Sequence, residues 1–149
     1  MIEGQEVHRF NLARCTFIIP LRIETADRMR NIITTLIYLT RNFACRIIVK
    51  EVDKESVYLR DVQPLLEQAL EPEMMNCITH IFEESDEFTF HRTKILNDML
   101  WMVKTPVVCN YDSDIILPVD SYINATNMIL KGWVHPDAAV SYTHLRAHE

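Results

Sequence analysis

The sequence predicts an α/β fold built on a mostly parallel sheet. Four short apolar runs rich in β-branched residues each carry a cysteine, and these cysteines recur at about the 30-residue length of a βα unit. The runs are Cys15–Pro20, Cys45–Val49, Cys77–Phe82 and Val107–Tyr111. Such runs are typical of strands buried on both faces, and amphipathic helical patterns lie between them. We therefore expect a parallel sheet covered by helices.

The first helix follows the first strand. From Ala26 to Thr40, apolar residues recur at steps of three and four, and charged residues fall on the opposite face. This pattern predicts an amphipathic helix with Thr25 as its N-cap. The segment 54–75 also has leucines at helical spacing, but Pro64 and Pro72 limit it to a short helix in a loop.

Two more helices are predicted in the second half of the chain. One extends from His91 to Lys104 and stops before Pro106. The other begins after Pro118, runs to Lys131 and ends at Gly132, a common residue after a helix end. Between them we expect a short fifth strand, after the Asp-Ser-Asp motif.

Composition indicates a soluble, single-domain protein. The 149 residues carry a formal net charge of −6, which disfavours nucleic-acid partners that are held through their phosphates. With two glycines, the chain has neither a P-loop nor a GxGxxG cradle. No apolar stretch is long enough to span a membrane and no signal peptide is visible, so we expect a cytoplasmic protein with no integral membrane segment.

The four cysteines form no CxxC pair and have no histidine at zinc-ligand spacing. The pattern disfavours a zinc site or a disulfide framework and favours cysteines as small buried hydrophobes. We also expect His80 to be structural, and Trp101 and Trp133 to lie in the core.

The last ten residues, Val140–Glu149, resemble a translated sequencing adapter. We therefore expect residues 140–149 to be a non-native tail and give no functional weight to His144 and His148. Residues 1–139 are then the N-terminal part of a longer domain, which makes the predicted sandwich incomplete at its C-terminal side.

The strongest chemical signal is Asp112-Ser-Asp114, which directly follows a buried strand. Ligands of open α/β sheets bind at the carboxyl ends of strands. Two hard oxygen ligands there suit Mg²⁺ or Mn²⁺ shared with a diphosphate. Taken alone, the motif is equally compatible with a solvated turn.

Two further motifs precede it in a fixed order. Pro20-Leu-Arg22 ends the first strand, and Phe90-His-Arg-Thr-Lys-Ile-Leu-Asn97 opens a helix. Together the three motifs resemble those of the GT-A fold nucleotide-sugar glycosyltransferases, close to glycosyltransferase family 2 and the β-1,4-galactosyltransferases. The galactosyltransferases carry Pro-Phe-Arg, Phe-Asn-Arg-Ala-Lys-Leu-Leu-Asn and Asp-Val-Asp in the same order. The resemblance implies a Rossmann-like three-layer sandwich and spans about Phe17 to Pro118.

The resemblance implies a metal-dependent transfer of a hexose from a nucleotide-diphosphate sugar, such as a UDP-sugar, to a glycan or another hydroxyl acceptor, as in polysaccharide biosynthesis. Asp114, with Asp112, would hold the metal. The residues implied at the nucleotide sugar are Pro20, Arg22, Glu51, Asp53, Arg92, Asn97 and Asp112. Of the two acids at the end of the second strand, Asp53 is preferred to Glu51 as the contact of the nucleobase.

The sequence departs from this pattern at His91 and Leu21, which replace the family's Asn and Phe, so no galactose donor follows. The resemblance implies inversion at the anomeric carbon, with a catalytic base beyond the end of this chain. By itself the chain would then be inactive.

Other interpretations stay open. Arg22 is compatible with a solvated helix face, and Arg92 with an ion pair to Glu83, Glu84 or Asp86 nearby. The whole chain is compatible with a non-catalytic nucleotide-binding or interaction module. A phosphatase of the haloacid dehalogenase type also uses an Asp-x-Asp motif, but on its first strand, whereas here the motif follows the fourth.

Overall fold

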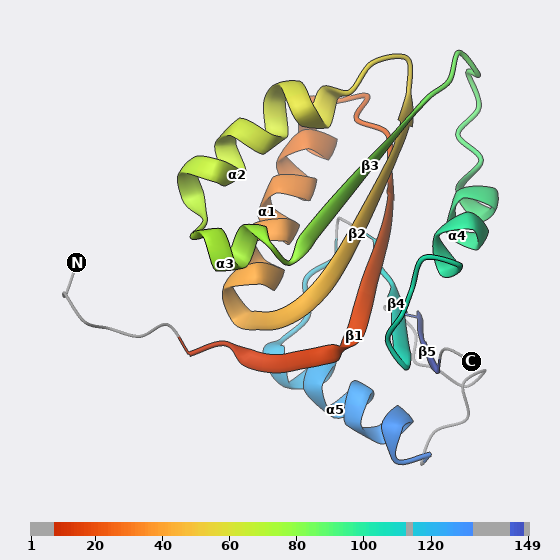
Figure 1. Ribbon diagram of the computed structural model, residues 1–149. Coiled ribbons are helices and arrows are strands. Elements are labelled where there is room, and N and C mark those ends of the chain that lie inside the picture. The colour runs from red at the N-terminus through yellow and green to blue at the C-terminus, as the bar shows by residue number, and fades with distance from the viewer. Residues whose placement is uncertain (1–7, 113–114, 133–143, 148–149) are drawn as a thin grey trace.

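The computed structural model describes residues 8–112 and 115–132, and the backbone of 144–147. A five-stranded sheet with the order β3-β2-β1-β4-β5 forms its centre (Figure 1). The strands are β1 (Phe10–Leu21), β2 (Phe43–Asp53), β3 (Ile78–Glu84), β4 (Val107–Asn110) and β5 (His144–Ala147).

The first four strands are parallel, as predicted. β1 lies between β2 and β4, with Ile18 opposite both Ile48 and Asn110. Beside β2, the register of β3 runs from Ile78 to Glu84. β1 begins at Phe10, five residues before the predicted Cys15. Phe10 and Asn11 pair with Phe43 and Ala44 at the start of β2, and the register shifts between Asn11 and Thr16.

Helices cover both faces of this sheet, so the predicted three-layer α/β sandwich is confirmed. Figure 1 shows α1, α2 and α3 on one face and α4 on the other. The helical elements are α1 (Ala26–Asn42), the π-helical turn η1 (Tyr58–Val62), α2 (Gln63–Ala69), α3 (Pro72–Met75), α4 (Arg92–Leu100) and α5 (Val119–Leu130). The predicted N-cap is also observed, since the Thr25 side chain accepts a hydrogen bond from the Arg28 backbone N–H at 3.1 Å.

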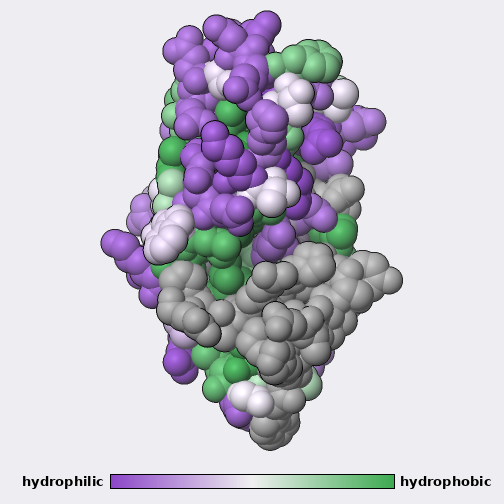
Figure 2. Space-filling model, turned by 90° about the vertical axis from the view of Figure 1, so that its right-hand side faces the viewer, coloured by the Kyte–Doolittle hydropathy of each residue, from purple (hydrophilic) through white to green (hydrophobic). Residues whose placement is uncertain are grey.

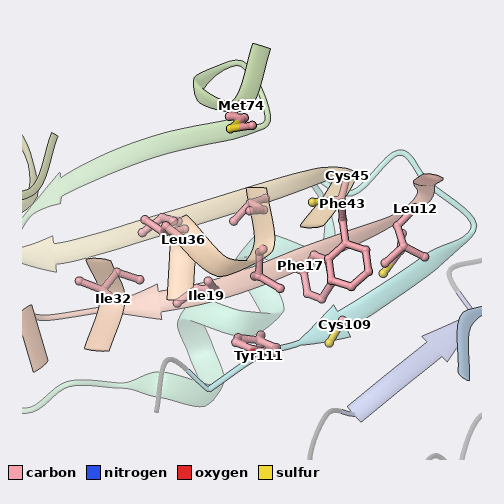
Figure 3. Packing of buried hydrophobic residues seen from close by; sticks show 14 of the residues in the cluster. Leu12, Phe17, Ile19, Ile32, Leu36, Phe43, Cys45, Met74, Cys109 and Tyr111 are labelled. Atoms are coloured by element: carbon pink, nitrogen blue, oxygen red, sulfur yellow. The ribbon is translucent and has the colours of Figure 1, made fainter. Parts of the chain in front are cut away.

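The larger core lies between the sheet and α1, α2, α3 and α5. Phe17 of β1 makes edge-to-face contacts with Tyr111 and Tyr122, and Phe43 packs against the same Tyr122. Figure 3 shows Phe17, Phe43 and Tyr111 among aliphatic and sulfur-containing side chains. Cys15, Cys45 and Cys109 are buried as predicted, whereas Cys77 is half-buried.

A smaller core holds α4 on the opposite face. Ile95, Met99 and Val103 pack there against apolar side chains of β1, β2 and β4. The expectation that Trp101 belongs to the core is wrong, because its side chain is 90% exposed. At 3.6 residues per turn, a position two residues after Met99 points away from the sheet. Trp133 lies outside the described residues.

Other elements differ from the predictions. α4 ends at Leu100 and not at Lys104, because the chain then turns tightly, with Met102 N–H bonded to Met99 O and Val103 N–H to Leu100 O. No strand forms over 115–118 in the described chain. β5, which falls within the segment 140–149, pairs antiparallel with β4.

The helices of the described residues include none that is both long enough and apolar enough to cross a membrane.

Candidate functional site

A pocket of about 380 Å³ opens at the carboxyl ends of β1 and β4. Four parts of the chain form its walls: the end of β1, the first two turns of α1, the start of α4 with the residues just before it, and the residues that follow β4. The lining residues are Pro20, Asp27, Arg28, Asn31, Phe90, Arg92, Tyr111 and Asp112. Pro20, Arg92 and Asp112 were predicted from the sequence as site residues, and the fold brings them to one cavity.

Arg92 and Asp112 form an ion pair in this pocket. The Arg92 Nη2 donates to Asp112 Oδ1, and also to Asn110 Oδ1 at 3.4 Å. Both side chains are about half exposed, at 41% and 50%. Arg92 therefore pairs with the acidic motif and not with Glu83, Glu84 or Asp86, the partners that the sequence left open.

Arg22 lies beside the pocket and does not line it. Its Nε donates to Val52 O at 2.8 Å, and its Nη1 donates to Phe88 O at 2.9 Å. The guanidinium also lies over the Phe90 ring, 5.3 Å from its centre. This buried arginine thus fixes the loop that presents Phe90 to the pocket. It is not a residue on a solvated helix face.

Two tyrosines hold the chain that follows the acidic motif. The Tyr111 hydroxyl bonds to Ile115 O and lies 2.7 Å from the Tyr122 hydroxyl, which accepts from Leu117 N–H at 3.0 Å. Burial, together with the neighbouring Tyr122, raises the pKa of Tyr111. These phenols remain protonated at neutral pH and act as hydrogen-bond donors. Their hydroxyls bond to Ile115 and Leu117, in the segment where a strand was predicted.

The sequence did not single out Tyr111, Asp27, Arg28 or Asn31. The three α1 residues lie on the polar face of the predicted helix, and a polar face is usually solvated. One signal could have identified them: the helix follows directly after the strand that ends with Pro20 and Arg22, so its first turns lie at the same edge of the sheet.

Glu51 and Asp53 do not line the pocket. The carboxylate of Glu51 is fully buried and accepts from Ser56 Oγ at 2.6 Å, Tyr58 N–H at 3.1 Å and His80 Nε2 at 3.1 Å. Burial alone would raise the pKa of Glu51, but these hydrogen bonds together lower it. His80 in turn stacks on Tyr58, 4.0 Å between ring centres, in the structural role expected for it.

Asp53 is half-buried at the end of β2, where its Oδ1 accepts from Lys54 N–H at 2.7 Å. Asn97 is exposed on α4 and is not among the lining residues. His91 precedes α4 and pairs with Glu87 at 2.9 Å, as expected for a residue at a helix start. Asp114 lies outside the described residues.

Within the described ranges, no group of three or more His, Cys, Asp or Glu side chains is placed to hold a metal ion. The pocket does supply carboxylate oxygens from Asp27 and Asp112. Mg²⁺ and related cations use one or two protein carboxylates and take their other ligands from substrate phosphates and water. The donor chemistry of the pocket therefore fits a cation that a diphosphate ligand would share.

No protein-family model matches this sequence, and no curated protein sequence matches it. Among solved structures, the chain is similar to the mannosyltransferase PcManGT from Pyrobaculum calidifontis in complex with GDP-Man and Mn²⁺, with a TM-score of 0.50 and 19% identity. The match covers 75% of this chain and 31% of that enzyme. At this identity the likeness concerns the fold alone: the chain has a Rossmann-like α/β fold similar to part of that enzyme.

Proposed function

We propose that this chain is the nucleotide-sugar-binding part of a metal-dependent glycosyltransferase. The enzyme would transfer a hexose from a nucleotide-diphosphate sugar to a glycan or another hydroxyl acceptor. The observation that carries the proposal is the Arg92–Asp112 pair in a pocket at the carboxyl ends of β1 and β4. It joins two motifs that lie 20 residues apart in the sequence.

The charges in the pocket suit a diphosphate. Arg28 and Arg92 offer two positive charges from different walls, and Asp27 and Asp112 offer two carboxylates. Fixed positive charge that is preorganised around a leaving group stabilises the negative charge that develops on it. A bare anion would be repelled by the carboxylates, whereas a diphosphate that shares a cation with them would not.

A bound Mn²⁺ or Mg²⁺ would act as a Lewis acid on the departing diphosphate. Asp112, together with Asp114, is the proposed protein ligand. Arg92 lines the same pocket as Asp112, so its guanidinium would face a diphosphate bound there. Arg92 would then neutralise charge on the leaving group.

The remaining predicted residues receive different parts in this proposal. Pro20 borders the nucleotide, and Arg22 acts through Phe90, whose ring it holds at the pocket wall. Asp53, at the end of β2, is the proposed contact of the nucleobase. Glu51 is less suited to that contact, because its buried carboxylate already accepts hydrogen bonds from Ser56, Tyr58 and His80. Asn97 stays a proposal from the motif alone.

The donor and the reaction course are also proposals. The motifs favour a UDP-sugar, whereas the similar mannosyltransferase was solved with GDP-Man; both donors carry the same diphosphate. An inverting reaction and a carboxylate base outside residues 1–139 follow from the same resemblance, and a cytoplasmic location stays a proposal from the sequence alone. None of these points changes the expected behaviour of the pocket.

Nucleotide binding to the 149-residue chain tests the proposal by calorimetry. UDP, GDP and their sugars are titrated with and without Mn²⁺, and uridine serves as a ligand without phosphate. We expect diphosphates to bind, Mn²⁺ to tighten binding, and Asp112→Asn and Asp114→Ala to remove that enhancement. Arg92→Gln should weaken binding about tenfold or more, as the loss of a charge-assisted hydrogen bond does.

The chain offers a matched control. Arg60 and Asp61 form another exposed ion pair, at 3.0 Å, on the turn before α2 and outside the pocket. Arg60→Gln and Asp61→Asn should therefore leave binding unchanged. If no nucleotide binds, or if Mn²⁺ and Asp112 have no effect, the chain is a non-catalytic module and the proposal fails.

The phosphatase alternative has a separate test. Its nucleophile would be Asp112, yet that residue follows β4 and already pairs with Arg92, while β1 ends in Pro20 and Leu21. We expect no acid-stable phosphate on Asp112 after incubation with phosphoryl donors. A phosphorylated Asp112 peptide in mass spectrometry would favour the phosphatase.

A further inference from the structure

Two cysteines and an arginine meet at the opposite end of the sheet from the proposed nucleotide pocket. Cys45 lies near the start of β2, Cys77 in the turn before β3, and Arg9 just before β1. All three line a second pocket, of about 370 Å³. Cys77 is half-buried and Cys45 is buried, and both line this pocket. Neither thiol has a part in the proposed nucleotide site.

The Cys77 sulfur contacts an arginine and a backbone carbonyl, the latter being Glu73 O at 3.7 Å. Arg9 Nη2 lies 2.9 Å from the sulfur, and the same Nη2 donates to Phe43 O at 2.8 Å, which anchors the guanidinium. Hydrogen bonding with Cys45 also favours the charged form of this sulfur and lowers its pKa. A hydrogen-bonded sulfur next to a guanidinium is the environment that favours a thiolate.

These contacts separate the two thiols chemically. The hydrogen bond from Cys45, the backbone N–H and Arg9 outweigh burial and lower the pKa of Cys77 to about 5. The same hydrogen bond, with burial, raises the pKa of Cys45. These opposite directions favour the thiolate at Cys77 and the thiol at Cys45. In the described chain, Arg9 Nε is buried without a hydrogen-bond partner, so one N–H donor of this guanidinium is unpaired.

We propose that Cys77 and Cys45 form a hydroperoxide-reactive site, in which Cys77 is the nucleophile and Cys45 resolves its oxidised form into a disulfide. In the first step the Cys77 thiolate attacks one oxygen of hydrogen peroxide. An S–O bond forms, the O–O bond breaks, and hydroxide leaves and takes up a proton to give water. Cys77 becomes a sulfenic acid, and the peroxide is reduced.

The second step uses the proton that Cys45 kept. Oxidation removes the negative charge of Cys77, and with it the main cause of the raised pKa of Cys45. Cys45 then loses its proton and attacks the Cys77 sulfur. The S–S bond forms, the S–O bond breaks, and the hydroxyl leaves as water with that proton. The product links β2 to the start of β3 near the amino ends of these strands.

Peptide mapping of the wild-type chain tests the first step without any variant. The reduced chain is alkylated with iodoacetamide between pH 4 and 9, and the rate is measured for each cysteine. We expect Cys77 to react first, with a rate that stays constant above about pH 6. Cys15 should stay protected, since its pKa is raised to about 12 by burial. Equal reactivity of Cys77 and Cys15 in the folded chain would overturn the proposal.

Peroxide titration tests the second step. With hydrogen peroxide, the intact wild-type mass should fall by two hydrogen atoms, and mapping should find a Cys45–Cys77 peptide pair. Cys45→Ser should instead accumulate a dimedone-reactive sulfenic acid on Cys77, and Cys77→Ser should give neither product. A sulfenic acid that persists in the wild-type chain would contradict the resolving role of Cys45.

Two arginines of the same pocket provide a matched pair. Arg9 contacts the Cys77 sulfur, whereas Arg46 is exposed and only lines the pocket, as does Glu73. Arg9→Gln should slow alkylation of Cys77 at pH 6 severalfold, because it removes the hydrogen bond and the positive charge by which Arg9 lowers the thiol pKa. Arg46→Gln should have little effect. Equal effects of the two variants would show that Arg9 has no specific role.

Discussion

The guanidinium of Arg22 lies 5.3 Å from the centre of the Phe90 ring and bonds to backbone carbonyls of Val52 and Phe88. One side chain thus joins the end of β1, the end of β2 and the loop before α4. Phe90 is the part of this arrangement that reaches the candidate pocket. A change at Arg22 should therefore affect both the position of Phe90 in the pocket wall and the stability of the fold.

Replacing Arg22 by Lys tests how this residue acts. Lysine keeps the positive charge but lacks the planar fork that bonds both carbonyls. We expect Arg22→Lys to lower the free energy of unfolding by about 1–3 kcal/mol, since the buried Val52 carbonyl loses its donor. Urea denaturation measures this loss. Nucleotide binding should weaken in the same variant.

If Arg22 instead contacts the phosphates by charge alone, Arg22→Lys would keep most of the nucleotide affinity. Arg30→Lys is the control for stability. Arg30 is 73% exposed and pairs only with the exposed Asp27 at 3.2 Å in the described structure, so its replacement should change stability by less than about 0.5 kcal/mol.

Acid should weaken the fold through Glu51. Its pKa in the folded chain is lowered below the ordinary 4.5, mainly by hydrogen bonds that outweigh burial. A depressed carboxyl pKa stabilises the folded state above the unfolded pKa, and this contribution disappears as pH falls through the folded pKa. We expect Glu51→Gln to be less stable than the wild type at pH 7 by about 1–3 kcal/mol.

This difference should shrink as the pH falls below 4.5, because protonation removes the advantage of the wild-type carboxylate. Urea denaturation at pH 7 and pH 4 measures it. Glu67→Gln, an exposed change on α2, should show the same small effect at both values. A difference for Glu51→Gln that does not depend on pH would contradict the assigned pKa direction.

The two tyrosines after β4 should act as one unit. Tyr122→Phe removes the hydroxyl that serves both Tyr111 and Leu117 N–H, so we expect a loss of about 1–2 kcal/mol in unfolding free energy. Tyr111→Phe should cost a similar amount. Because both variants break one shared hydrogen bond, the double variant should lose less than the sum of the two. Additive losses in urea denaturation would show that the hydroxyls act independently.

The attachment of α4 depends on its small core. Met99 is fully buried there, and Met99→Ala should lower the unfolding free energy by about 2–5 kcal/mol because it leaves a cavity. Trp101→Ala, two residues later, is the control and should change it by less than about 0.5 kcal/mol. Figure 2 shows the side of the molecule on which α4 lies in Figure 1. Hydrophilic side chains dominate its upper part, and a hydrophobic area lies lower down. A large loss from Trp101→Ala would place that side chain against the fold after all.

Local patterns were enough to predict most of the fold. Hydrophobic periodicity located the four parallel strands and α1 with its Thr25 cap, because burial of one face leaves a regular record in the sequence. The prediction of a short helix in a loop over 54–75 was only partly right: η1, α2 and α3 all form there, and helical structure continues from η1 into α2 across Pro64, which lies in the first turn of α2. Trp101 was misplaced because hydrophobic character alone does not show which face of a helix end a residue occupies.

The sequence by itself determined the strands, the helices that connect them and three ordered motifs. These features are visible in the sequence because each depends on residues that lie close together along the chain. Only the tertiary structure decided which motif residues meet. It paired Arg92 with Asp112, turned Arg22 toward backbone carbonyls, and enclosed Glu51 with His80. It also gathered Arg9, Cys45 and Cys77 from three separate segments. Such contacts depend on strand order and register, which bring residues from distant parts of the chain within hydrogen-bond range.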